Sequence, residues 1–177
     1  MSHALTHRAV AAASFALCST AFAQQAPEQL RPPANEKVVL VAYATGVQIY
    51  ECSSDPTTYA WQWVFKGPEA ELHDKAGAAI GKHYAGPTWE LPDGSKVLGE
   101  VRAQAASADA GAIPLLLLNA KSNSGSGALR MVRSVQRLDT WGGRAPSEAC
   151  SHESSGKTAR VPYKATYYFY GPESGRS

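Results

Sequence analysis

The run His83–Glu90 carries the side chains best suited to chemistry in this chain. It places an imidazole at His83, a phenol at Tyr84, an indole at Trp89 and a carboxylate at Glu90. Imidazole and carboxylate groups act as general acids, general bases or metal ligands, while aromatic rings offer large flat contact surfaces. Together with Trp141 from a Gly-rich stretch, these four residues are our candidate ligand-binding set. The sequence identifies no catalytic residue and predicts no cofactor.

A metal centre at His83 and Glu90 would need further ligands, because a structural zinc ion takes four. His73, Asp74 and His152 carry suitable groups. The chain has neither a His-x-His nor a His-Glu-x-x-His spacing that would indicate convergence of these side chains. The sequence therefore predicts no metal site, and metal-assisted hydrolysis is kept as an alternative.

Hydrolysis by carboxylates is a second enzymatic alternative, since glycosidases place two carboxyl groups roughly 5–10 Å apart. The candidate acids are Glu51, Glu90, Asp93 and Glu100, and the candidate stacking rings are Trp61, Trp89 and Trp141. Acyl transfer has less support, because the chain has no Gly-x-Ser-x-Gly nucleophile motif.

The elements that position these residues are predicted to be β-strands, because side chains alternate between two faces along a strand. Thr88 and Glu90 then share one face, and Trp89 and Leu91 share the other. The turn signal Pro-Asp-Gly that follows predicts a hairpin with Ser95–Gln104.

Two further stretches alternate clearly. One side of the last strand carries Tyr163, Ala165, Tyr167 and Phe169. An earlier strand places four aromatic residues on one side, namely Tyr59, Trp61, Trp63 and Phe65. Aromatic rings at period two are usually a core face, and an exposed platform for sugar rings is the alternative. We expect Gly67-Pro68 to end this strand and Gly46 to break the one before it.

Many short strands separated by Gly and Pro turns predict an all-β fold. The expected architecture is a single-domain antiparallel β-sandwich or β-barrel, with short helical turns at most. Periodicity does not select between sandwich and barrel.

The first residues have the basic start, apolar run and Ala21-Phe22-Ala23 site of a secretory signal peptide. We therefore divide the chain into a signal peptide (1–23), a polar linker (24–33), a single β domain (34–172) and a tail (173–177). Cleavage near Ala23 predicts a secreted or periplasmic protein, and no second apolar segment is long enough for a membrane span.

Charge argues against nucleic acid as a partner. The chain has 17 Lys and Arg and 15 Asp and Glu; removing Arg8 with the signal peptide leaves 16 against 15, a net charge of +1. Nucleic-acid binding rests on a concentrated basic patch. The mild cluster of Arg130, Arg133 and Arg137 is interpreted as a solvated strand face.

Two cysteines remain after processing, Cys52 and Cys150. Two thiols in one small exported domain most often pair, so we predict a disulfide bond between them.

Several stretches together resemble a family of secreted proteins from bacteria and fungi, grouped as domain of unknown function 3455. They are Gly46–Cys52, Gly81–Glu90, Ile113–Leu118, Val135–Arg137 and Thr140–Pro146, followed by Cys150. The resemblance implies a shared β-rich fold and export, and it brings no catalytic residues.

The functional expectation is a secreted soluble β domain that binds a small ligand or a carbohydrate in a cleft near His83, Trp89 and Glu90. The alternatives are the hydrolases described above and a structural envelope protein without a ligand. The expected partner is a small molecule or glycan.

Overall fold

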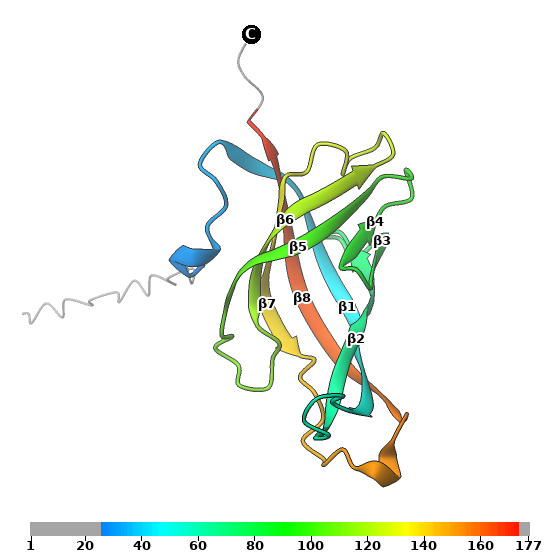
Figure 1. Cartoon of the computed structure of the whole chain (residues 1–177). Coiled ribbons are helices and arrows are strands. Elements are labelled where there is room, and N and C mark those ends of the chain that lie inside the picture. The colour runs from blue at the N-terminus through cyan, green and yellow to red at the C-terminus, as the bar shows by residue number, and fades with distance from the viewer. Residues whose placement is uncertain (1–25, 174–177) are drawn as a thin grey trace, which may run out of the picture.

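The computed structural model describes residues 26–173 and forms a closed barrel of eight antiparallel strands (Figure 1). Each strand pairs with the next, and the last pairs with the first. The elements are η1 (Glu28–Leu30), β1 (Glu36–Ser54), β2 (Trp61–His73), β3 (Ala79–Tyr84), β4 (Thr88–Glu90), β5 (Lys96–Ala105), β6 (Leu115–Ser124), β7 (Ser134–Gly142), η2 (His152–Ser154) and β8 (Thr158–Pro172). The all-β prediction is confirmed, with the barrel as the outcome. The predicted signal peptide and residues 174–177 lie outside the described residues.

The barrel interior is built by the alternation of strand side chains. On β8, Tyr163, Ala165, Tyr167 and Phe169 are all at most 4% exposed and join one core, which confirms their predicted shared face. Each residue between them points away from that core, because successive side chains of a strand alternate between its faces.

Buried apolar side chains fill the barrel core at the end that carries the β4–β5 turn, namely Leu91, Val97, Leu129, Val132 and Phe169. The turn between β4 and β5 is joined to this end by Asp93, whose carboxylate accepts bonds from the Ser95 hydroxyl (2.6 Å) and the Ala128 N–H (2.8 Å). These bonds lower the pKa of Asp93, with the Ser95 hydroxyl contributing most. The predicted hairpin is confirmed, since β4 pairs with β5 across this turn.

The hairpin of β3 and β4 is too short to close the other half of the barrel wall (Figure 1). β3 pairs only with Glu69–His73 of β2, and β4 pairs only with Lys96–Leu98 of β5. The Gly99 N–H still donates to the Pro87 carbonyl at 2.9 Å. Beyond these points, residues 61–68 and 100–105 have no strand partner on this side among the described residues. We call the gap between these two segments the side opening.

Gly46 and Gly67 lie inside strands, where breaks were expected, so that expectation was wrong. A Cβ added at Gly46 would lie 2.2 Å from the Glu69 carbonyl oxygen, so its glycine lets β1 and β2 approach closely. Gly67 has a φ of 153° and sits against Ala85, where a Cβ would come within 2.7 Å of the Ala85 Cβ. The register between β1 and β2 shifts here, because Ile49 pairs with Gly67 whereas the next residue, Tyr50, pairs with Phe65.

The expected aromatic core face on β2 was also wrong. Tyr59 is 78% exposed and Phe65 is 51% exposed, and Trp61 and Trp63 are only half-buried. Phe65 lines the side opening, where no neighbouring strand covers the edge of β2. Trp61 instead packs edge-on against His152, and Trp63 Nε1 donates to the Glu148 carbonyl.

Part of the predicted polar linker packs on the barrel. Leu30 of η1 is fully buried, and its carbonyl accepts a hydrogen bond from the Gln136 side chain. Composition did not indicate this contact, because one apolar side chain is enough to anchor the segment.

The predicted disulfide is confirmed. Cys52 at the end of β1 bonds to Cys150, with 5.5 Å between their Cα atoms. The bond ties the long β1–β2 hairpin to the segment that leads into η2. Between residues 26 and 173, no helix has the length and apolar character to cross a bilayer.

Candidate functional site

The structure divides the predicted site residues between two faces of the β3–β4 hairpin. His83 and Trp89 point into the barrel and are 2% and 1% exposed. They face each other across the strand pair, with their rings stacked 4.5 Å apart at an angle of 6°. Tyr167 packs edge-on against both rings, at 5.0 and 5.3 Å.

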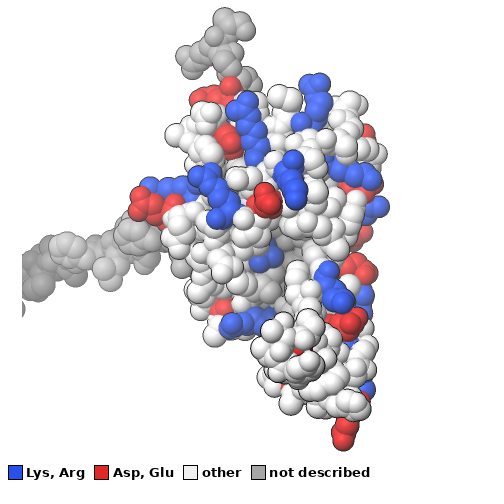
Figure 2. Space-filling view, in the orientation of Figure 1, with Lys and Arg blue, Asp and Glu red and all other residues white. Residues whose placement is uncertain are grey.

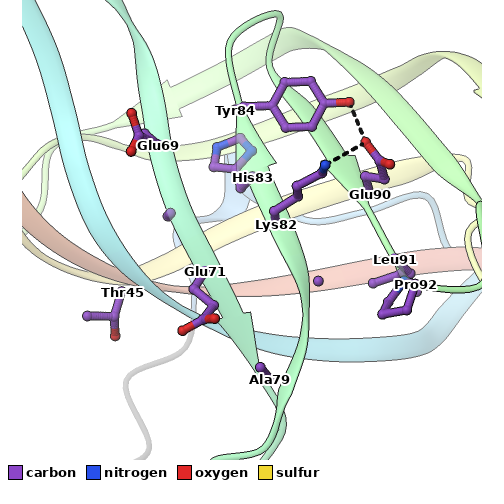
Figure 3. Close-up of a pocket in the computed structure, with 12 residues that line it drawn as sticks. Thr45, Glu69, Glu71, Ala79, Lys82, His83, Tyr84, Glu90, Leu91 and Pro92 are labelled. Atoms are coloured by element: carbon purple, nitrogen blue, oxygen red, sulfur yellow. Dashed lines mark hydrogen bonds and ion pairs between the residues drawn. The ribbon is translucent and has the colours of Figure 1, made fainter.

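Tyr84 and Glu90 lie on the outer face of the same hairpin (Figure 3). The Tyr84 hydroxyl donates to Glu90 Oε2 at 2.8 Å. Lys82 and Lys96 approach the same oxygen at 3.6 and 3.3 Å. The predicted sharing of faces is therefore confirmed, with Glu90 turned outward and Trp89 inward.

Trp141 joins neither pair. It lies on β7 opposite Lys164 of β8, and its side chain is 56% exposed. It lines neither of the two cavities described next.

The outer groove is a cavity of about 600 Å³ on the outside of β1 to β4, drawn in Figure 3. Its polar lining residues are Thr45, Glu69, Glu71, Lys82, His83, Tyr84 and Glu90. Arg160 binds both oxygens of Glu69, at 2.9 and 3.0 Å, and His73 lies 3.0 Å from Glu71. The charged groups of the outer groove thus already have partners within the protein.

These pairings favour ionised carboxylates. The hydrogen bond from Tyr84, followed by the nearby lysines, lowers the pKa of Glu90. Arg160 likewise lowers the pKa of Glu69. A glycosidase general acid needs a raised pKa. The other two shifted carboxyl groups of residues 26–173, Asp55 and Asp93, also have lowered pKa values. Nothing in these shifts supports the hydrolase alternative.

The metal alternative gains no support from the geometry either. His83 lies inside the barrel, Glu90 outside it, and His73 is engaged with Glu71. Within the described part of the chain, no three His, Cys, Asp or Glu residues gather closely enough to hold a metal ion.

The second cavity, of about 470 Å³, lies behind the side opening. Its two lips carry Phe65 of β2 and Val101 of β5, which are 51% and 52% exposed. Its inner wall includes Gln48, His83 and Arg137. Gln48 is only 2% exposed, so an amide lies deep inside the barrel.

Several polar atoms on the inner face of the barrel have no hydrogen-bond partner within residues 26–173. They are Gln48 Nε2, Trp89 Nε1 and the hydroxyl oxygens of Tyr163 and Tyr167. The two hydroxyls make no hydrogen bond of good geometry, but they lie close enough to shift each other's pKa, and Arg137 lies close enough to lower that of Tyr167. An unpaired buried polar group costs about 1–3 kcal/mol, so such groups are rare in folded proteins. Gln48 and Tyr163 are close neighbours, because a Cβ added at Gly143 would lie 3.0 Å from Gln48 Cγ and 2.8 Å from Tyr163 Cβ.

His83 presents one defined nitrogen to this interior. Its Nδ1 lies 2.8 Å from the Thr88 carbonyl oxygen, which can only accept, so Nδ1 carries the proton. Burial lowers the pKa of His83 to about 3, so the ring is neutral at physiological pH. Nε2 is then an acceptor.

Arg137 supplies a positive charge in the cavity wall that no carboxylate pairs with in the described chain, whereas Lys66 pairs with Glu51. Its Nε and Nη2 donate to the Pro114 carbonyl at 3.1 and 2.8 Å, which fixes the plane of the guanidinium group. Burial raises the pKa of Tyr50, Tyr163 and Tyr167, and the charge of Arg137 opposes that rise at all three. Arg137 is therefore electrostatically coupled to the buried phenols.

Sequence reasoning missed Gln48 and Arg137 as site residues. Arg137 was interpreted as part of a solvated face, which was wrong: it lies two residues after buried Val135, on the inward side of β7. Arg130 and Arg133 are exposed, as expected. The available signal was a polar residue at an inward position of an alternating strand, a pattern that Gln48 shares.

Comparison with known proteins gives a family and no named relative. No curated protein and no solved structure matches the chain. Residues 32–171, most of the sequence, match the family described as "Protein of unknown function (DUF3455)". The chain therefore belongs to the DUF3455 family, as its resemblance implied.

Proposed function

We propose that this protein binds a small organic molecule inside its barrel, and that the molecule enters through the side opening. The observation that carries the proposal is the set of polar groups that line this cavity, above all the buried Gln48 Nε2, which has no hydrogen-bond partner among the described residues. A ligand with complementary polar groups would remove their desolvation cost on binding.

The shape of the cavity supports this proposal. Its volume of about 470 Å³ falls within the range of small-molecule sites, roughly 300–1,000 Å³. Such sites are mostly apolar with a few placed polar groups. Here the exposed Phe65 and Val101 provide apolar lips, and the polar groups lie deeper.

The outer groove supports a binding role less well, although it contains Tyr84 and Glu90 from the sequence-based candidate set. A ligand there would have to displace existing pairs such as Tyr84–Glu90 and Arg160–Glu69. The cleft first expected near His83, Trp89 and Glu90 is thus replaced in our proposal by the barrel interior, with His83 retained in its wall.

The test uses the neutral fluorescent probe N-phenylnaphthylamine and a pair of matched substitutions. Leu116 lines the cavity, and its neighbour Leu115 points to the other face of β6. We expect Leu116→Trp to fill the cavity and to weaken probe binding at least about tenfold. Leu115→Trp should leave the affinity within about twofold of wild type.

Two outcomes would overturn the proposal. The first is that the folded wild-type protein does not bind the probe. The second is equal binding by wild type and Leu116→Trp, with circular dichroism showing that both are folded. Either outcome would favour ordered water in the cavity and a structural role for the protein.

We also infer that the protein acts outside the cytoplasm, either secreted or periplasmic. The support is the predicted signal peptide together with the Cys52–Cys150 disulfide, a bond typical of oxidising compartments. Fractionation of a bacterial host expressing chains with and without residues 1–23 tests this. Equal cytoplasmic retention of both chains would contradict it.

A further inference from the structure

We propose that the ligand of the side opening is an amphipathic anion, with an acidic group bound by Arg137 and an apolar body held between Phe65 and Val101. This inference rests on the proposed function and adds the chemical class of the ligand. A carboxylate is the acidic group that best matches the planar guanidinium.

The charges around the cavity are one-sided. Its lining includes two cations, Lys66 and Arg137, and no carboxylate. Lys66 pairs with Glu51 at 3.4 Å, whereas Arg137 takes part in none of the ion pairs between residues 26 and 173. Arg137 is half-buried and has no acidic partner in the described chain, so an incoming anion would supply the counter-charge that this side of the cavity lacks.

Arg137 is oriented for such a partner. The Pro114 carbonyl accepts from Nε and Nη2, and the guanidinium also lies close enough to the Tyr167 hydroxyl to lower the pKa of that phenol. The remaining guanidinium hydrogens can serve a ligand. A guanidinium held in a fixed plane loses less freedom when it binds a ligand. Charge-assisted hydrogen bonds to a carboxylate are roughly twice as strong as neutral ones.

The neutral polar groups of the interior add mainly donors. The Gln48 amide nitrogen lines the cavity and is unpaired within the described chain, whereas the hydroxyls of Tyr163 and Tyr167 belong to residues outside the lining. Burial raises the pKa of both phenols, so they keep their protons and can donate. Only His83 Nε2 offers a ring acceptor, because Nδ1 is engaged by Thr88. A donor-rich site fits an anion better than a neutral polar molecule.

The lips of the side opening suit the apolar part of the same molecule. Phe65 and Val101 are large hydrophobic residues that are about half exposed, and they face the cavity together with Pro87 and Leu116. The face seen in Figure 2 is hollowed near its centre, and a Lys or Arg side chain is recessed in the hollow with no Asp or Glu beside it. An apolar rim and a cation inside the cavity together suit an amphipathic anion.

A pair of probes that differ in one acidic group tests the inference. Anilinonaphthalene sulfonate is the sulfonated, anionic counterpart of the neutral N-phenylnaphthylamine. With the mature, disulfide-bonded protein, we expect both probes to bind. Arg137→Gln should weaken the anionic probe at least about tenfold and leave the neutral probe within about twofold.

Two further variants separate site from bulk charge and fold. Arg130→Gln removes the same charge from the exposed segment at the packed end of the barrel, and should change neither affinity. Arg137→Lys keeps the charge and should restore part of the anionic affinity. Circular dichroism and thermal unfolding of each variant exclude probe binding to a loosened fold.

The outcomes distinguish this inference from the proposed function. Equal effects of Arg137→Gln on both probes, or an effect of Arg130→Gln as large as that of Arg137→Gln, would overturn the anion inference and leave the binding site standing. Failure of the wild-type protein to bind either probe would overturn both.

Discussion

The outer groove and the side opening lie on opposite sides of one barrel wall, and they treat polar groups in opposite ways. In the outer groove, Glu90 accepts a hydrogen bond from Tyr84 and lies near two lysines, and Arg160 binds both oxygens of Glu69. Behind the side opening, Gln48 lines the cavity with a buried amide nitrogen that has no partner in the described chain, and the interior also holds the unpaired hydroxyls of Tyr163 and Tyr167.

The difference teaches where to look for a binding site in this fold. Exposed ion pairs contribute little to stability and are already screened by water. The charged groups of the outer groove would therefore gain little free energy from binding a ligand. An unpaired polar atom in the wall of a cavity does favour a ligand or an ordered water, because leaving it buried without a partner costs free energy. The less conspicuous set of residues is therefore the stronger candidate.

The largest expected effect concerns the open half of the barrel, where the edges of β2 and β5 are not paired with the β3–β4 hairpin. In this half the disulfide joins β1 to the segment before η2. Replacing Cys52 and Cys150 by serine should lower the free energy of unfolding by roughly 2–5 kcal/mol, because the bond spans a separation of 98 residues. Urea unfolding followed by tryptophan fluorescence measures the change. A loss below about 1 kcal/mol would show that the open half needs no covalent support.

The second effect is the pH dependence introduced by His83. Its pKa is about 3 in the folded protein and near 6.5 in the unfolded chain. Above pH 6.5 both states are neutral at this ring, so no stability is lost. As the pH falls below 6.5, the unfolded state binds a proton that the folded state does not. Stability should then decrease by up to about 1.4 kcal/mol per pH unit.

The interval from pH 6.5 to 4.5 isolates this group, since Asp and Glu residues with lowered pKa values contribute mainly below 4.5. Urea unfolding at several pH values in this interval gives the slope. His83→Gln, which cannot titrate, should flatten it even if the variant is less stable overall. An unchanged slope in that variant would mean that other groups cause the pH dependence.

The smallest effect is also the most direct comparison of the two regions. Tyr84→Phe removes a satisfied hydroxyl from the outer groove and should reduce stability slightly. Tyr167→Phe removes an unpaired hydroxyl from the interior, so stability should be unchanged or raised by up to about 1 kcal/mol. Thermal unfolding of the two variants, with the wild type beside them, measures both.

A clear loss of stability in Tyr167→Phe would show that its hydroxyl already has a partner, such as an ordered water. The contrast between the two regions would then be much weaker than we describe. Anionic probe binding should stay constant in Tyr84→Phe, because Tyr84 does not line the cavity behind the side opening, which provides a second readout independent of stability.

Much of the fold could be predicted from alternation alone. The inward face of β8 and the hairpin of β4 and β5 follow from local pattern and turn chemistry. The core position expected for Phe65 did not follow, because burial depends on which strand lies beside the edge. No local pattern specifies that β3 and β4 stop short of that edge.

The candidate site was less predictable, because alternation separates neighbours in sequence. His83 and Tyr84 are adjacent in the chain and lie on opposite faces of β3. Arg137 and Gln48 are far apart in sequence, and only closure of the barrel places both in one cavity wall. The disulfide was predictable because only two cysteines remained to pair.

The short reach of β3 and β4 has a consequence for how this scaffold can vary. Closure elsewhere depends on long pairings such as β1 with β8, which have no need of that hairpin. Lengthening β3 and β4 by a few residues would narrow the side opening, and shortening them would widen it. Selectivity for the size of a guest molecule can therefore be adjusted at one surface hairpin while the rest of the architecture stays constant.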